Sequence, residues 1–266
     1  MSKGEPRRSS FSHLPSTAAA ALAALIALTA TATLTEASER KFTYVYQTTT
    51  EAPGEIEYEQ WITWKTDKGS DSEYDRFDIR HELEIGLTEN LQLGLYLADW
   101  RSQRGSSVGD GVEYRGTAVE LIYNLTDPTV DFLGSALYGE LKLGPELFEL
   151  EGKILLEKNI GKWTGAYNAG IESEWEGDNF GEDKGELFQS FGLSYQVSPK
   201  FTLGAEVLHE IPVPDWSDTG DSVLYLGPNA SFRTDDWWVT LTPLFQVTDE
   251  DSEADFQLRL IFGFTF

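Results

Sequence analysis

The chain has 266 residues, of which 45 are acidic and 20 are Lys or Arg, so its formal net charge is -25. Such an acidic chain is expected to repel nucleic acid and anionic lipid surfaces unless metal ions intervene. It contains no cysteine, which excludes disulfides and, with only three histidines, argues against zinc, haem and iron–sulfur sites. No phosphate-binding glycine loop opens a helix, so no cofactor is expected.

The first 32 residues have the parts of a secretory signal peptide. Basic residues are followed by an apolar run at residues 18–30, and Ala30 to Ala32 form a small-x-small cleavage site, with cleavage after Ala37 as a second possibility. An uncleaved anchor helix is the alternative, although the run is short for crossing a bilayer. Beyond it no apolar run approaches the roughly 20 residues of a transmembrane helix. The mature chain is therefore expected to be exported.

Residues 33–54 precede the first predicted strand. Apolar and polar residues begin to alternate regularly only at Glu55. If the strands that follow form a barrel in an outer membrane, residues 33–54 are expected to be a periplasmic N-terminal segment. For Phe42 to Pro53 two possibilities stay open, a periplasmic segment or a plug.

From Glu55 to the C-terminus the alternation repeats, with turn signals at intervals of roughly ten to fifteen residues, as in consecutive barrel strands. In the clearest case Phe77 and Ile79 face one side, whereas Arg76 and Asp78 face the other. Twelve strands are predicted, at 55–66, 72–87, 91–101, 112–126, 132–144, 146–158, 163–177, 184–197, 201–211, 221–234, 237–249 and 254–266.

The last strand decides which solvent the apolar face meets. Large apolar residues occupy every second position from Phe256 to Phe266, against a mostly polar opposite face. Such a face on an exported chain is what a membrane-spanning barrel strand requires. A soluble barrel would have to turn its charged face outward and its apolar face inward on every strand, which the charged positions disfavour. The predicted fold is all-β, a transmembrane antiparallel up-and-down β-barrel of about twelve strands over residues 55–266.

The connections suggest an orientation. Those at Thr88 to Asn90 and Ser198 to Lys200 are short, whereas those at Arg101 to Gly111 and Pro212 to Asp221 are long. Because bacterial barrels place short turns in the periplasm and long loops outside, both termini are expected in the periplasm.

Aromatic side chains also concentrate near the predicted strand ends, where barrels carry girdles at the two membrane interfaces. The chain has 8 Trp and 1 Met, which suits girdles better than a packed soluble core. The expected girdle residues are Trp64, Trp100 and Trp175 near the outer ends, and Tyr123, Trp163, Tyr195, Trp237 and Trp238 near the inner ends.

The C-terminal pattern from Leu258 to Phe266, with Phe262, Phe264 and Phe266 at its end, resembles that of bacterial outer-membrane β-barrels. In those proteins the terminal-Phe pattern is an assembly signal read by the barrel assembly machinery. The stretches 42–46, 59–64 and 76–88 look like a family of outer-membrane barrels of unknown function. The resemblance implies a fold, a bacterial outer-membrane location and contact with lipid and lipopolysaccharide. It implies no catalytic residue.

The predicted inward face collects charges, and acidic ones outnumber basic ones. A wet lumen of this kind favours cations. Alternatively, the arginines pair with the glutamates and fill a narrow interior with salt bridges. The candidate lumen or pore-lining residues are Glu57, Glu59, Arg76, Asp78, Arg80, Glu82, Glu84, Glu120, Glu140, Lys142, Glu172, Glu174, Glu206 and Arg259.

No enzymatic activity is expected. His13 lies in the signal, and His81 and His209 share the apolar face, with no serine two residues on. Acidic loops such as Asp178 to Asp183 match no calcium-binding motif, so no specific metal site is expected either.

The sequence therefore predicts a monomeric, porin-like outer-membrane channel for passive diffusion of small hydrophilic solutes, with a preference for cations. The alternative is a non-conducting structural or surface-interaction barrel with a salt-bridged lumen.

Overall fold

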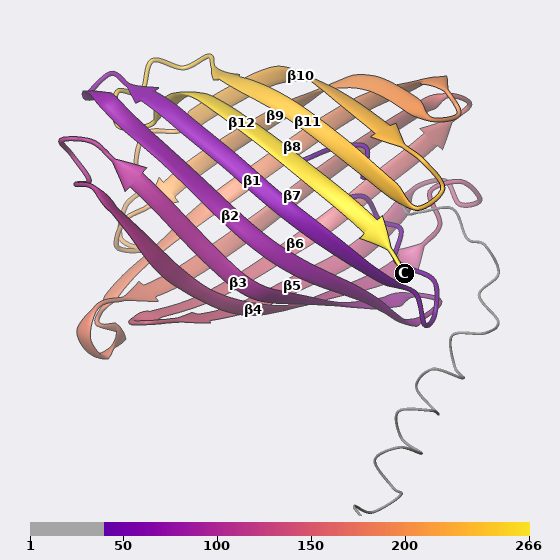
Figure 1. Cartoon of the computed structure of the whole chain (residues 1–266), viewed down its shortest axis with the longest axis horizontal. Coiled ribbons are helices and arrows are strands. Elements are labelled where there is room, and N and C mark those ends of the chain that lie inside the picture. Colours follow the sequence, from indigo (N-terminus) through magenta and orange to yellow (C-terminus); the bar gives the residue numbers. More distant parts are fainter. Residues whose placement is uncertain (1–39) are drawn as a thin grey trace, which may run out of the picture. The chain divides into compact units, whose positions relative to one another are not determined.

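The computed structural model describes residues 40–266, so the predicted signal peptide lies outside the described residues. Twelve antiparallel strands follow one another around a closed barrel, and β12 pairs with β1 (Figure 1). Both the fold class and the strand number predicted from the sequence are confirmed. The strands are β1 (Ile56–Lys68), β2 (Asp71–Thr88), β3 (Leu91–Arg104), β4 (Gly111–Thr126), β5 (Gly134–Gly144), β6 (Leu147–Ile160), β7 (Trp163–Glu176), β8 (Glu182–Ser198), β9 (Phe201–Val213), β10 (Val223–Arg233), β11 (Trp237–Gln246) and β12 (Ala254–Thr265).

The barrel closes between the first and last strands. Glu57 lies opposite Thr265 and Thr63 opposite Arg259 in the β1–β12 ladder. Beyond the last paired residue, the Phe266 amide donates to the Ile56 carbonyl at 2.9 Å. Closure leaves no strand of the barrel with a free edge, which is how a sheet satisfies its backbone groups within a bilayer.

The two faces of the barrel differ in polarity. Outward-facing side chains are large and apolar, for example Leu97, Ile154 and Phe245, each about half exposed. Inward-facing side chains are mostly polar, and Glu59 and Glu206 are completely buried. A water-soluble barrel has the reverse arrangement. The apolar residues of the alternating pattern therefore face lipid, and the polar residues face the lumen.

One tryptophan departs from the predicted girdle pattern. Trp163 and Trp100 face outward and pack on Tyr195 and Tyr114, as expected. Trp238, however, is fully buried inside the barrel, because its neighbour on the strand takes the outward position. The expectation that Trp238 belongs to a girdle is wrong.

A β-bulge changes which residues of β3 face inward. The register shifts between Tyr96 and Asp99 against β4. Both Tyr96 and Asp99 are therefore buried, and Leu97 between them faces outward. Strict alternation predicts Ala98 on the inner face instead, which is wrong because the bulge inserts an extra residue.

We name the two ends of the barrel by their connections. At the short-turn end, β1 begins, β12 ends, and β8 and β9 are joined through residues 199–200. At the loop end lie the connections 105–110 and 214–222, but also the two-residue connection 69–70. The short 3-10 helix η2 (Asp178–Phe180) lies in another loop there. No helix among residues 40–266 is long and apolar enough to cross a membrane.

Candidate functional site

Residues 40–52 lie inside the barrel, and we call this segment the plug. In Figure 1 it belongs to the indigo coil that precedes β1. Phe42 and Thr48 are almost fully buried. The backbone amides of Thr43, Tyr46 and Thr48 donate hydrogen bonds to inward-facing side chains of β9, β7 and β6. Of the two arrangements left open by the sequence, the contacts correspond to the plug.

Glu206 on β9 holds the middle of the plug. Its carboxylate accepts hydrogen bonds from the backbone amides of Thr43, at 2.9 Å, and Tyr44, at 2.6 Å. The hydroxyl of Thr242 donates to the same carboxylate at 2.6 Å. A buried carboxylate is tolerated only when donors surround it, and here the plug supplies two of them.

The side chain of Asn168 on β7 bonds to both backbone polar groups of Tyr46, as a paired strand residue would. Its Oδ1 accepts from the Tyr46 amide at 2.6 Å and its Nδ2 donates to the Tyr46 carbonyl at 2.9 Å. Glu157 accepts from the Thr48 amide at 2.8 Å. Side chains of the barrel wall thus provide most hydrogen-bond partners of the plug backbone. Buried backbone amides need such partners.

Aromatic packing completes the plug. The Tyr46 ring lies 5.0 Å from Tyr138, edge-on, and 6.2 Å from Trp61, measured between centroids. Phe42 lies against Gly192, where an added Cβ would come within 2.6 Å of the Phe42 ring. Gly192 is therefore the wall position that makes room for the plug ring.

Arg40 links the plug to two glutamates of the wall. Its guanidinium lies 2.7 Å from Glu59 and 2.5 Å from Glu84. It also lies over the Tyr46 ring, 4.5 Å from the centroid. The guanidinium of arginine stays protonated in proteins, and here it is paired with two carboxylates. Arg40 is therefore a fixed positive charge at the base of the plug.

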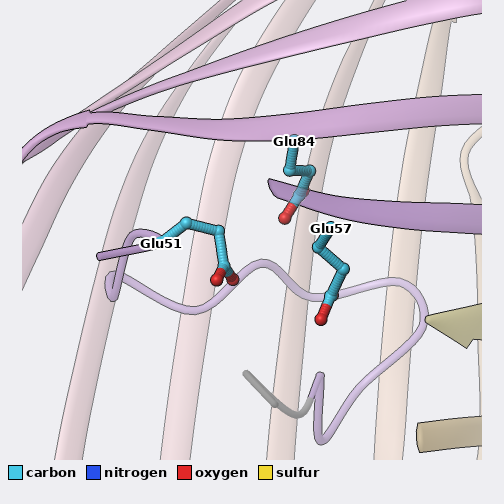
Figure 2. Close-up of side chains that lie close together, drawn as sticks. All are labelled: Glu51, Glu57 and Glu84. Atoms are coloured by element: carbon cyan, nitrogen blue, oxygen red, sulfur yellow. The ribbon is translucent and has the colours of Figure 1, made fainter. Parts of the chain in front are cut away.

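Carboxylates crowd around this charge. Oxygen atoms of Glu51, Glu57 and Glu84 lie within 4.8 Å of one another, and Figure 2 shows the three side chains directed toward one region between plug and wall. Oxygen atoms of Glu59, Glu82 and Glu84 form a second such group. The four wall glutamates face each other across β1 and β2, with Glu57 opposite Glu84 and Glu59 opposite Glu82.

Nearer the loop end, the candidate charges form ion pairs. Arg80 lies 2.7 Å from Glu140, and Lys142 lies 2.7 Å from Asp99. Asp78 pairs with Arg76 at 2.7 Å, so three of the basic candidates have acidic partners across or along the wall.

The remaining candidates also face inward. Arg259 donates to the hydroxyl of Thr63 and to the carbonyl of Thr43. Tyr96 donates to Glu120 at 2.7 Å. Glu174 is paired with Lys184 at 2.7 Å. Glu172 belongs with Glu149 and Glu174 to a third carboxylate group. Whether these residues line a conducting path stays a prediction.

Sequence reasoning restricted to charged residues missed several parts of this site. Asn168 and Gln92, which accept hydrogen bonds from plug amides, are uncharged. Trp238 donates to Glu57 at 2.9 Å. Their positions in the strand alternation place these residues on the inner face, and this signal was present in the sequence. Nothing in the neighbouring sequence identified the residues that they contact.

The histidines lie on the outer face. His81 is 2.8 Å from the Tyr58 hydroxyl, and His209 is 3.0 Å from the Gln189 amide nitrogen. Among the described residues neither imidazole is hydrogen-bonded to a serine.

The family model of DUF6662, a family of unknown function, matches residues 34–147 and 146–260. The chain belongs to this family. No curated protein matches the chain. The resemblance to a barrel family of unknown function, expected from the sequence, is thereby confirmed.

The chain matches several solved structures. A NanC porin has a TM-score of 0.52 at 8% identity, covering 79% of this chain and 98% of that one. OmpT of Vibrio cholerae has a TM-score of 0.42 at 10% identity, covering 82% and 100%. OprB of Pseudomonas putida, in its low-pH structure, has a TM-score of 0.36 at 12% identity, covering 80% and 91%. Together with the apolar exterior, the NanC likeness shows that this DUF6662 protein has the fold of an outer-membrane β-barrel.

Proposed function

We propose that this DUF6662 protein is a channel for passive diffusion of small hydrophilic solutes, and that the plug holds it closed. The observation that carries the proposal is how the plug is held. Its backbone bonds to side chains such as Glu206 and Asn168 rather than to the edge of a strand. Side-chain hydrogen bonds can be exchanged for water without breaking the barrel ladder, so the segment can leave while the wall stays intact.

The charge of the lumen gives the open channel its preference. Inward-facing glutamates outnumber the arginines and lysines among the candidate residues, and Arg40 would leave with the plug. A lumen that then carries a larger negative excess favours cations over anions. The short-turn end is proposed to face the periplasm, as in bacterial barrels with short periplasmic turns.

The alternative is a non-conducting barrel. It is favoured by the ion pairs Arg80–Glu140 and Lys142–Asp99, which fill the lumen beyond the plug. In that case the plug is a permanent core and the protein acts through its lipid-facing or loop surfaces. Contacts with lipopolysaccharide and a monomeric state belong to both proposals.

Single-channel recording separates the two. The mature chain, refolded and checked for heat-modifiable migration, is placed in a planar bilayer with a salt gradient and compared with Glu206→Ala/Asn168→Ala. The double variant removes the acceptors of three plug amides, so its open fraction should rise, with a cation-selective reversal potential. Glu186→Gln is the control, because among the described residues Glu186 forms no hydrogen bond with the plug.

The outcomes point in different directions. Openings that are rare in the natural chain and frequent in the double variant support a plugged channel. Folded barrels that stay silent in both forms favour the non-conducting alternative. Anion selectivity would contradict the argument from the acidic lumen.

A further inference from the structure

Glu82 on β2 is an unusual buried acid. Its side chain is completely buried, and neither carboxylate oxygen has a hydrogen-bond partner among the described residues. Removing a charged group from water without a partner is strongly unfavourable. A proton or a bound cation must therefore neutralise this carboxylate.

Its surroundings make the need larger. Glu59 lies directly opposite Glu82 in the β1–β2 ladder, and Glu84 follows on the same inward face. Like charges directly opposite one another destabilise a sheet. Across β3, Glu120 adds a fourth carboxylate nearby, because a Cβ on Gly94 would meet both Glu82 and Glu120.

The nearest cation does not resolve this. Arg40 forms ion pairs with Glu59 and Glu84 but not with Glu82. Three carboxylates against one guanidinium leave a local excess of negative charge. Glu82 therefore presents two free oxygens toward a strongly negative region.

The geometry suits a hard cation. Oxygen atoms of Glu59, Glu82 and Glu84 lie within 4.8 Å of one another. Calcium binds oxygens at about 2.3–2.6 Å, so ligands on opposite sides of one ion lie at about this separation. A cavity of about 30 Å³, bordered by Glu84, Arg40 and Glu51, adjoins the group and has room for a coordinating water.

We propose that Glu59, Glu82 and Glu84 bind one divalent cation of the calcium class at the base of the plug. The ion would balance the carboxylates that Arg40 leaves uncompensated and would join β1 and β2 under the plug. Sequence reasoning looked for such sites in the acidic loops, whereas this one combines two strands. The proposal concerns binding alone and does not depend on conduction.

Terbium luminescence tests the site directly. Tb³⁺ replaces Ca²⁺ and emits when a nearby indole is excited, and the Trp61 indole donates to Glu59 at 2.8 Å. The full mature chain, refolded in a zwitterionic detergent and freed of metal with a chelator, is titrated with Tb³⁺ and then with Ca²⁺. We expect saturable emission that Ca²⁺ displaces.

Glu82→Gln is the decisive variant, because it removes a charge and no hydrogen bond. It should weaken Ca²⁺ competition by about tenfold or more, since losing even an outer-shell partner of a metal site costs about that much. Glu210→Gln, an inward-facing acid on β9, should leave binding unchanged. Emission that is absent in the natural chain, or equal effects of the two substitutions, would overturn the proposal.

Thermal unfolding gives a second readout that does not use light. Without divalent cations Glu82→Gln should unfold at a higher temperature than the natural chain, since repulsion is relieved. With saturating Ca²⁺ the order should reverse, because only the natural chain gains the full stabilisation by binding. A variant that is more stable at every Ca²⁺ concentration would show that the acids are accommodated without a cation and would overturn the proposal.

Discussion

The backbone amide of Tyr44 donates a 2.6 Å hydrogen bond to the carboxylate of Glu206, a residue 162 positions later in the chain. The plug is thus fixed by a wall residue that is distant in sequence. Its stability should respond to changes in the wall as strongly as to changes in its own residues, and the first two predictions use this dependence.

Gly192→Ala should displace the plug by a steric clash. A Cβ at this position would approach the buried Phe42 ring to 2.6 Å, and overpacking of this kind costs about 1–3 kcal/mol. We expect a higher open fraction in single-channel records. Gly139→Ala is the matched control, since nothing lies within 4 Å of its added Cβ. Identical records for the two variants would argue that Phe42 does not gate the lumen.

Glu206→Ala should loosen the plug without opening the barrel ladder. The amides of Thr43 and Tyr44 lose their acceptor, at a cost of about 1–3 kcal/mol for each amide that stays unpaired. Amide hydrogen exchange at both residues should accelerate, while exchange in the β strands is unchanged. The same measurement on Glu186→Ala serves as the reference, and equal exchange in both variants would contradict the assigned role of Glu206.

Trp238→Phe should destabilise the barrel, whereas Trp237→Phe should not. Trp238 is fully buried and donates to Glu57 at 2.9 Å, so its replacement leaves a buried carboxylate oxygen without that donor, costing about 1–3 kcal/mol. Trp237 faces outward and packs on Phe232 and Phe262. Urea unfolding in lipid vesicles measures both. Greater destabilisation by the Trp237 change would contradict the placement of the two rings.

Phe266→Ala should impair assembly in cells more than folding in the test tube. Phe266 is 73% exposed, so its ring adds little burial. The hydrogen bond from its backbone amide to the Ile56 carbonyl is kept by any residue except proline. If the terminal aromatic is an assembly signal, the heat-modifiable form in the cell envelope should fall several-fold, with unchanged refolding into vesicles. Equal loss in both settings would mean that the ring acts through stability.

The β4–β5 connection should respond to acid. The Val130 and Thr129 amides donate to Asp127, at 2.9 and 2.6 Å, and these bonds hold the pKa of Asp127 below its usual range. A lowered pKa means that the stabilisation is present above the usual value of about 3.9 and is lost as pH falls toward the lower folded value. Amide proton shifts of the two donors should therefore titrate in this acidic window. Asp127→Asn keeps an acceptor and should abolish the titration.

Much of the wall could be predicted from local pattern. The strand predicted at 163–177 occurs as β7 (Trp163–Glu176), because alternation there is uninterrupted. The strand predicted at 237–249 ends at Gln246, because the Gln246 side chain accepts from the Glu250 amide and starts a turn. The inward position of Trp238 was not recognised, since an aromatic residue near a strand end fits either face.

The sequence could not decide whether the segment before β1 is a plug or a periplasmic segment. In residues 42–53, apolar and polar residues do not alternate regularly, so the pattern does not show which side chains face inward. The hydrogen-bond partners of this segment, Glu157, Asn168 and Glu206, lie more than 100 positions away in the chain. Each of those partners has an inward parity that the sequence reveals, but parity says only that a side chain enters the lumen. It does not say which other side chains or backbone groups it meets there.

The sequence by itself determined the solvent of each face, because a strand alternates with a period of two and a membrane requires one apolar face throughout. Only the tertiary structure decided the contents of the lumen. The β1–β2 register sets Glu59 opposite Glu82, and the folded chain brings Arg40 to Glu59 and Glu84. These contacts depend on closure of the barrel and on the path of the plug, and both are set by interactions between residues far apart in the chain.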